Sequence, residues 1–206
     1  MPRYVDHEQR RREVAEVAAR LVSGEGRKAL TVRRVADAAG QSTTVVSHYF
    51  DDMDELLYET YSLAVRRSRA RIDAVLESDP ADIVGLAEAL LPIDAERKAD
   101  WRIWLAFWGE ALGSPDLAAE QRRRARTSAD RFHSCLELLD ADGGVVGEPD
   151  LRALADRIAA LILGIAAEAV FDPRKWAAAA QRDAIQAVLA GSGVVLDAAP
   201  AISTRS

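Results

Sequence analysis

Residues 30–50 are LTVRRVADAAGQSTTVVSHYF, and this stretch decides the fold. Thr31 can cap a helix whose apolar residues recur at helical spacing, and Gly40 stands where that helix must end. Ser42 can then cap a second short helix over residues 43–49. Two short helices joined by a tight turn are typical of a helix-turn-helix, whose second helix enters the major groove of DNA.

The second of these helices has an apolar and a polar side. Its apolar anchors are Val45 and Val46, with Phe50 directly after it. The remaining side chains are small or hydrogen-bonding: Thr43, Thr44, Ser47 and His48. Base edges in the major groove present donors and acceptors that such groups can match, so we expect this surface to select a DNA site.

The composition is that of an ordinary soluble globular chain of one or two domains, with 206 residues, 49% hydrophobic and 29% charged. The single cysteine, Cys135, excludes a disulfide within the chain and favours a cytoplasmic location. No apolar run at the N-terminus resembles a signal peptide. We expect no membrane span, because the most apolar run, residues 158–171, is too short and contains Glu168.

The net charge of −6 is unevenly distributed. Residues 1–50 hold nine Lys/Arg and six Asp/Glu, a net of +3, and the remainder holds eighteen and twenty-seven, a net of −9. A basic segment on an acidic body fits a protein that touches phosphate with one end only, although an excess of this size also arises by chance.

Helical periodicity continues through the rest of the chain, and no segment alternates as a strand does. A helix precedes the helix-turn-helix over residues 6–24, and Asp51 caps a long helix over 52–78. Caps followed by proline, as at Asp79-Pro80 and Asp172-Pro173, mark the starts of later helices. The later helices are predicted over residues 79–91, 94–112, 114–140, 149–171 and 172–190.

The predicted fold class is therefore all-α, with about nine helices. Residues 1–50 form a three-helix bundle that contains the helix-turn-helix. The long helix joins it to a larger α-helical domain over residues 51–190. Residues 191–206 have no periodicity and are expected to form a flexible tail.

Across residues 9–57 the chain resembles the TetR family of transcriptional regulators. The segments TVRRVADAAG and STTVVSHYF, followed by DELL at the start of the long helix, have the family's order and spacing. The form VVSHYF is similar to the BetI-like branch. The resemblance implies a homodimer with two recognition helices on a pseudo-palindromic operator of double-stranded DNA. It also implies a C-terminal cavity whose small-molecule effector releases the repressor from DNA.

The resemblance assigns roles to individual positions. It places the DNA contacts at Thr31, Arg33, Gln41, Ser42, Thr43, Thr44, Ser47, His48 and Tyr49. Tyr49 matches a phosphate-contacting tyrosine, and Thr31 and Arg33 lie where the first short helix meets the backbone. It places a homodimer interface on the helices over 149–171 and 172–190, at Leu154, Ile158, Leu161, Ile162, Ile165, Trp176, Ile185 and Val188.

Three positions depart from the family pattern. Many members have glycine near Thr44 and tyrosine at Ser47, and many have lysine at Met53, which here lies within the acidic run 51–55. The acidic run favours the positive end of the helix dipole but places negative charge near phosphate, which predicts weaker or more salt-sensitive binding. A basic N-terminal arm can compensate or can be a solvated helix start: Arg3, Arg10, Arg11 and Arg12.

Three of the four tryptophans, Trp101, Trp104 and Trp108, lie on one face of a single helix, with Phe107 on the other side. The alternatives for them are core packing and the wall of a ligand cavity. Glu168 lies in an apolar stretch and Glu110 near the Phe107 side. Aromatic walls with a buried carboxylate suit a cationic amine, with a neutral or anionic hydrophobic ligand as the next choice.

The sequence contains no phosphate-binding glycine loop, nucleophile elbow or metal-ligand spacing. We therefore expect no enzymatic activity, no cofactor and no metal site, and we assign His133 and Cys135 to the core. The alternative function is a helical small-molecule-binding protein with weakened or lost DNA binding, for which Met53 and its acidic neighbours are the only hints.

Overall fold

The computed structural model describes residues 7–147 and 149–196. In these ranges the chain is helical, and its only β-type pairing is a single bridge between Val145 and Val194. The all-α prediction is therefore confirmed. The helices are α1 (His7–Glu25), a 3₁₀ turn η1 (Arg27–Ala29), α2 (Val32–Ala39), α3 (Thr43–Tyr49), α4 (Met53–Ser78), α5 (Ile83–Leu90), α6 (Ala95–Ala111), α7 (Pro115–Ala141), α8 (Leu151–Phe171) and α9 (Ala178–Gly191).

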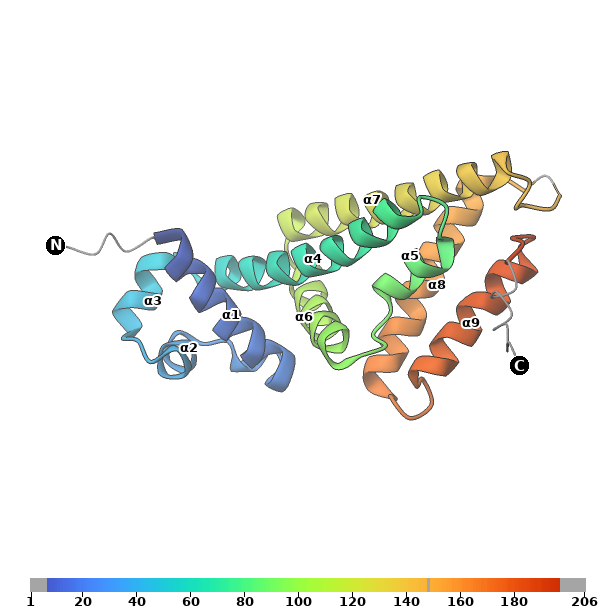
Figure 1. Ribbon diagram of the computed structural model, residues 1–206. Coiled ribbons are helices and arrows are strands. Elements are labelled where there is room, and N and C mark those ends of the chain that lie inside the picture. The colour runs from blue at the N-terminus through green and yellow to red at the C-terminus, as the bar shows by residue number, and fades with distance from the viewer. Residues whose placement is uncertain (1–6, 148, 197–206) are drawn as a thin grey trace, which may run out of the picture.

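The helices α1, α2 and α3 form a small bundle at one end of the molecule (Figure 1). The Thr31 hydroxyl accepts from the Arg34 amide at 3.3 Å, and the Ser42 hydroxyl accepts from the Val45 amide at the same distance. Gly40 has φ of 62° and ψ of 33°, the left-handed conformation that lets α2 end and the chain turn. Local capping chemistry thus sets the helix-turn-helix at the predicted residues.

The long helix α4 leaves this bundle and runs beside α7 into the rest of the molecule (Figure 1). The bundle and the body share one hydrophobic core. Val46 and Leu56 belong to the same buried cluster as Trp104 and Phe107 of α6. The bundle therefore packs directly on α4 and α6.

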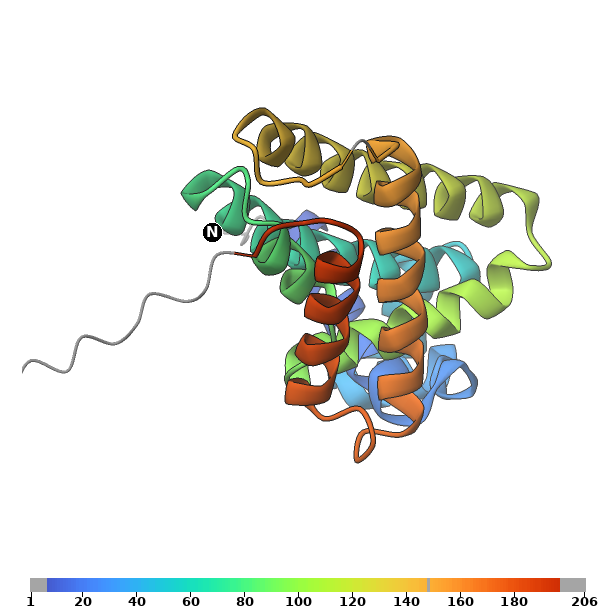
Figure 2. The ribbon, with the colours of Figure 1, turned by 90° about the vertical axis from the view of Figure 1, so that its right-hand side faces the viewer.

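A second core lies among α5, α7, α8 and α9, and Figure 2 shows α8 and α9 side by side on one face. Five of the predicted dimer contacts are buried in this core: Leu154, Ile158, Ile162, Ile165 and Ile185. Their prediction as interface residues is wrong, because this apolar stripe packs against α7 residues such as Phe132 and Leu136. The other three are half-buried: Leu161, Trp176 and Val188.

Two helices begin later than predicted. Asp79 uses its carboxylate to accept from the Ala81 amide, which makes a turn, and Asp82 caps α5 by accepting from Gly85. Asp172 likewise accepts from the Lys175 amide in a turn, and α9 starts at Ala178. An Asp-Pro pair is compatible with both a helix start and a turn, and here it marks turns.

The tail prediction does not hold for residues 191–196. The Val146 amide donates to the Gly193 carbonyl at 2.7 Å, and the Val195 amide donates to the Gly144 carbonyl at 2.9 Å. Val194 is buried between them. The α7–α8 loop and the segment after α9 hold each other through these bonds. The rest of the predicted tail, 197–206, lies outside the described residues.

Candidate DNA-binding surface and ligand pocket

The helix α3 places its polar side chains on the surface. Val46 is fully buried beneath the helix, and Phe50 is 2% exposed. Tyr49 is half-buried. The other predicted contacts are all exposed: Thr31, Arg33, Gln41, Ser42, Thr43, Thr44, Ser47 and His48. These side chains are free to meet a partner without disturbing the core.

Tyr49 lies in a small group of rings that includes one residue the sequence did not point to. Its ring centroid is 5.4 Å from that of His48 and 5.6 Å from that of His7, and both contacts are edge-on. His7 comes from the first turn of α1. These neighbours limit the positions that the Tyr49 ring can occupy at the edge of the surface.

Arg11 fixes the end of α3. Its guanidinium donates to the Tyr49 carbonyl at 2.5 Å, to Glu55 at 2.6 Å and to Glu59 at 3.2 Å, and it lies 4.5 Å from the centre of the Phe50 ring. The hydrogen bond from Arg11 holds the pKa of Glu55 below its usual range. Arg11 therefore clasps α1, α3 and α4 together and is not a free DNA-binding arm.

The other arginines of the predicted N-terminal arm differ in their contacts. Arg10 pairs with Glu13 at 3.0 Å, and Arg12 is exposed. Arg3 lies outside the described residues. Only Arg12 of these arginines combines exposure with no ion pair among the described residues, so it is the arm residue best able to meet phosphate.

The acidic start of α4 is occupied by internal contacts. Asp52, and not Asp51, caps the helix, because its carboxylate accepts from the amides of Asp54 and Glu55 at 2.9 and 2.7 Å. The Asp54 carboxylate pairs with Arg27 at 3.1 Å. Since Glu55 pairs with Arg11, much of the negative charge that would oppose DNA is neutralised within the bundle.

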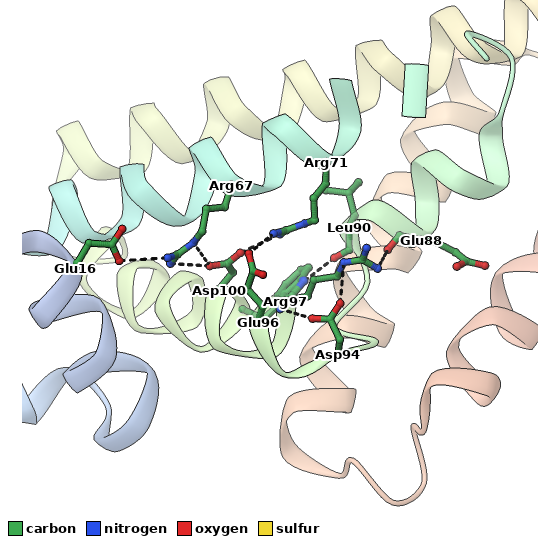
Figure 3. A network of polar contacts seen from close by, with 10 residues as sticks. Glu16, Arg67, Arg71, Glu88, Leu90, Asp94, Glu96, Arg97 and Asp100 are labelled. Carbon is green, nitrogen blue, oxygen red and sulfur yellow. Dashed lines mark hydrogen bonds and ion pairs between the residues drawn. The ribbon is translucent and has the colours of Figure 1, made fainter. Parts of the chain in front are cut away.

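A polar network joins the bundle to the body (Figure 3). Asp100 of α6 is fully buried and contacts Arg67 and Arg71 of α4, each at 2.9 Å. Arg67 also reaches Glu16 of α1 at 3.5 Å. Burial raises the pKa of the Asp100 carboxyl even with both arginines beside it. The network ties α1, α4 and α6 together at one place.

A pocket of about 410 Å³ lies among α4, α6, α7 and α8, with Leu90 at its edge. Its volume is in the range of small-molecule sites. Trp101, Trp104 and Trp108 line it from α6. The Trp101 ring contacts the Trp104 and Trp108 rings edge-on at 4.8 and 5.8 Å, and its indole N–H donates to the Leu90 carbonyl at 2.6 Å. The three rings thus form an aromatic wall that the Trp101 hydrogen bond anchors, and the buried indole N–H groups of Trp104 and Trp108 have no hydrogen-bond partner in the described residues.

The other predicted pocket residues lie elsewhere. Phe107 is buried in the core, where its ring stacks on Tyr61 with a centroid separation of 3.7 Å. Glu110 pairs with Arg27 at 3.4 Å, and Glu168 is exposed. The prediction of a buried carboxylate for a cationic ligand is therefore wrong: the apolar neighbours of Glu168 in sequence cover the other faces of α8.

The pocket is also lined by arginines that the sequence pattern did not indicate. They come mainly from α7, whose run QRRRARTSADR over residues 121–131 also supplies Gln121 and Ser128. The sequence shows the run of arginines, but which of their side chains face the pocket depends on how α7 packs. The six lining arginines are Arg69, Arg123, Arg124, Arg126, Arg131 and Arg152.

The part of the chain that the structure describes contains no group of three or more His, Cys, Asp or Glu residues placed to hold a metal ion. No helix in that part is long and apolar enough to cross a membrane. Cys135 is buried, and burial raises the pKa of its thiol to about 12.

Comparison with known proteins identifies the class to which this fold and these two sites belong. Residues 14–60 match the family of bacterial regulatory proteins of the TetR type, and residues 80–192 match the C-terminal domain of BetI-type transcriptional repressors. The chain belongs to the TetR family of transcriptional regulators, with an N-terminal helix-turn-helix domain and a C-terminal ligand-binding domain. These relatives are regulators and not enzymes.

Individual relatives cover most of the chain. The regulator PksA of Bacillus subtilis is 27% identical over 176 residues, 84% of each chain. The regulator BetI of Burkholderia cenocepacia is 31% identical over 173 residues, 80% of this chain and 84% of that one.

Solved structures agree in fold. A transcriptional regulator from Rhodococcus sp. Rha1 is 26% identical with a TM-score of 0.77, covering 90% of this chain and 99% of that one. A regulator from Saccharomonospora viridis, solved in complex with choline, is 24% identical with a TM-score of 0.78, covering 91% and 98%.

Proposed function

We propose that this chain acts in the cytoplasm as a homodimeric repressor that binds an inverted-repeat operator through α3 and leaves it when a small molecule fills the tryptophan-lined pocket. The observation that carries the proposal is the surface of α3. Its polar side chains are exposed, while Val46 beneath them is fully buried. A helix held in this way can enter a major groove without cost to the core.

Within α3, Thr44 and Ser47 are assigned to base edges and Tyr49 to the DNA backbone. Both hydroxyls lie on the exposed side of the helix. Tyr49 lies at the edge of the surface, braced by His7 and His48. A hydroxyl donates and accepts, so these positions select bases differently from the glycine and tyrosine of many relatives.

The coupling between pocket and DNA is assigned to α4 and α6. Each helix contributes some residues to the wall of the pocket and others to the polar network around Asp100. On α4, Arg69 lines the pocket while Arg71 binds Asp100. On α6, Trp101 and Trp104 line the pocket, and they lie one residue and one helical turn after Asp100. A ligand that separates the two helices would strain the contacts of Asp100 and move α1 through Arg67 and Glu16.

The dimer is assigned to the outer face of α8 and α9. Because the apolar stripe lies in the core, the outward face of α8 that remains beyond the pocket carries Gly164, with Phe171 78% exposed at the end of the helix. Ala187 is exposed on α9 beside it. Small residues let two copies approach closely, and Leu161, Trp176 and Val188 keep partial exposure at the margin.

Fluorescence anisotropy on a labelled fragment of the DNA upstream of the coding sequence tests the DNA assignment. Thr44→Ala and Tyr49→Ala should each weaken binding about fivefold or more, since a lost base or phosphate contact is worth about 1–3 kcal/mol. Ser134→Ala on α7 is the matched control, because Ser134 is exposed, does not line the pocket and is remote in sequence from α3. Wild-type affinity in both α3 variants would overturn the docking of α3.

Sedimentation velocity tests the dimer. Gly164→Glu should give folded monomers, because a Cβ at Gly164 meets nothing within 4 Å inside the chain. Gly109→Glu on α6, also free of neighbours within 4 Å, is the control and should stay dimeric. A dimeric Gly164→Glu protein would show that the interface lies elsewhere.

A further inference from the structure

We propose that the effector of this regulator is an amphipathic organic anion, with an aromatic or other flat apolar body that ends in a carboxylate. The inference rests on the proposed function, since it names the ligand class of the same pocket. It reverses the charge that the sequence led us to expect, and it follows from the charged groups that line the cavity.

The lining has a strong excess of positive charge. It contains six arginines and a single carboxylate, Asp156. Three further carboxylates, Asp73, Glu120 and Asp130, pair with these arginines from outside the lining. With all four carboxylates counted against the six arginines, two positive charges remain around the pocket.

The excess has a structural origin, because two carboxylates are each shared by two arginines. Asp73 pairs with Arg69 at 3.4 Å and with Arg131 at 3.5 Å. Arg131 has a side chain only 23% exposed, and burial together with the charge of Arg69 lowers its pKa. Each such group of three charges has a net charge of +1, which a ligand carboxylate would neutralise.

The second shared carboxylate is Glu120, which pairs with Arg123 at 2.7 Å and with Arg124 at 2.5 Å. Its hydrogen bond from Arg123 lowers its pKa, so it is ionised at neutral pH and does not offer a proton to a ligand. Arg124 also lies 5.3 Å from the centre of the Tyr61 ring. Arg126 adds a third positive charge, exposed and without an ion pair among the described residues, whereas Arg152 pairs with both Asp130 and Asp156, a net of −1 that brings the total around the pocket to +2.

The positions along α7 define how an anion would lie. Arg124, Ser128 and Arg131 are spaced by four and three residues, so they share one face of the helix over about 10 Å. The tryptophans line the same cavity from α6. A ligand can place its apolar body against the tryptophans of α6 and its carboxylate at Arg124 or Arg131 of α7. Ser128 can donate a further hydrogen bond to that carboxylate.

A cationic ligand, such as a quaternary ammonium or an amine, would find too few carboxylates and too many arginines in this pocket. The two glutamates that would have paired with it, Glu110 and Glu168, lie outside the lining. Its aromatic contacts would be offset by repulsion from Arg124 and Arg131, whose side chains are only 25% and 23% exposed and are therefore less screened by water than the other lining arginines. The chain thus has the fold of a regulator solved with choline, but its pocket has the wrong charge for such a cation.

Isothermal titration calorimetry with three matched probes tests the inference: 4-phenylbutyrate, 4-phenylbutanamide and 4-phenylbutylamine. They share the ring and chain and differ in charge at pH 7. We expect the carboxylate to bind about tenfold or more tighter than the amide, and the amine to bind weakest. Equal or tighter binding of the amine, or no binding of any probe at millimolar concentration, would overturn the inference.

Charge-neutral variants locate the anion. Arg131→Gln should weaken 4-phenylbutyrate about tenfold and leave 4-phenylbutanamide unchanged, because Asp73 keeps Arg69 as its partner. Arg124→Gln is the second variant, and Glu120 then keeps Arg123. Arg122→Gln is the matched control: Arg122 lies on the same helix, is exposed and does not line the pocket. An anion preference unchanged in both pocket variants would contradict the assignment.

The same titration with the protein bound to labelled upstream DNA separates the two proposals. Binding of 4-phenylbutyrate that leaves the DNA complex intact supports the anion site and counts against release by this pocket. DNA release by the amine, with no effect of the carboxylate, supports a ligand-released repressor and overturns the anion site.

Discussion

Replacement of Arg11 by Met tests whether this arginine is a structural clasp or a DNA-binding arm. The variant loses three hydrogen bonds, to the Tyr49 carbonyl, Glu55 and Glu59, and the charge above the Phe50 ring. Methionine keeps much of the apolar stem of arginine and so retains packing against the ring.

The magnitude follows from exposure. A buried charge-assisted hydrogen bond contributes about 1.5–3 kcal/mol. Here the side chains of Arg11, Glu55 and Glu59 are 26%, 34% and 28% exposed, so water screens each bond to about 0.5–1 kcal/mol. Three such bonds and a ring contact of about 0.5 kcal/mol give a loss of about 2–3.5 kcal/mol in the free energy of unfolding.

The loss should depend on pH. Arg11 lowers the pKa of Glu55 below its ordinary value of 4.5, so the pairing stabilises the fold above that pH and its contribution disappears as pH falls through the lower, folded-state pKa. The difference between wild type and Arg11→Met should therefore be largest near neutral pH and shrink below about pH 4.5.

Urea unfolding followed by far-UV circular dichroism measures this difference at pH 7 and at pH 4, with all proteins at one protomer concentration because dimers are stabilised by mass action. Arg12→Met is the matched control. Arg12 lies next in the helix and is exposed, so its variant should keep wild-type stability while DNA affinity falls. Equal stability of the Arg11 and Arg12 variants, within about 0.5 kcal/mol, would refute the clasp.

Three further predictions concern the fold. Gly40→Ala should destabilise the protein by about 1–2 kcal/mol, measured by urea unfolding, because Gly40 has a φ of 62°; an unchanged midpoint would mean that the turn relaxes. Ile158→Ala should cost about 2–4 kcal/mol yet leave the protein dimeric in sedimentation, since Ile158 is 1% exposed in the core of its own chain; dissociation without loss of stability would restore its place in the interface. Cys135 should resist thiol labelling at pH 8 until the protein unfolds, because burial raises its pKa to about 12; rapid labelling of the folded protein would show that α7 opens locally.

The helix-turn-helix could be predicted from sequence because its determinants are local. Thr31, Gly40 and Ser42 act on residues within three or four positions, and the polar side of α3 follows from the burial of Val46. Such contacts involve neighbours in sequence, so the pattern of residue types is enough to place them.

The polar network and the pocket depend on contacts between distant residues. Arg71 and Asp100 are 29 residues apart, and Arg27 and Glu110 are separated by more than eighty. Glu168 is exposed although its neighbours in sequence are apolar. Its exposure follows from the helical face on which it lies, and residues four positions apart share that face. Gly164, four residues earlier, is also exposed. Whether a side of α8 faces α7 or solvent is decided by packing.

We propose that two copies of this chain select one DNA sequence through α3. Selection from a random double-stranded DNA library with the purified full-length protein measures it directly. We expect enrichment of an inverted repeat whose half-sites lie about one helical turn apart, or a multiple of it, and loss of that enrichment in Thr44→Ala. No enrichment by the folded dimer, or enrichment of isolated half-sites, would contradict it.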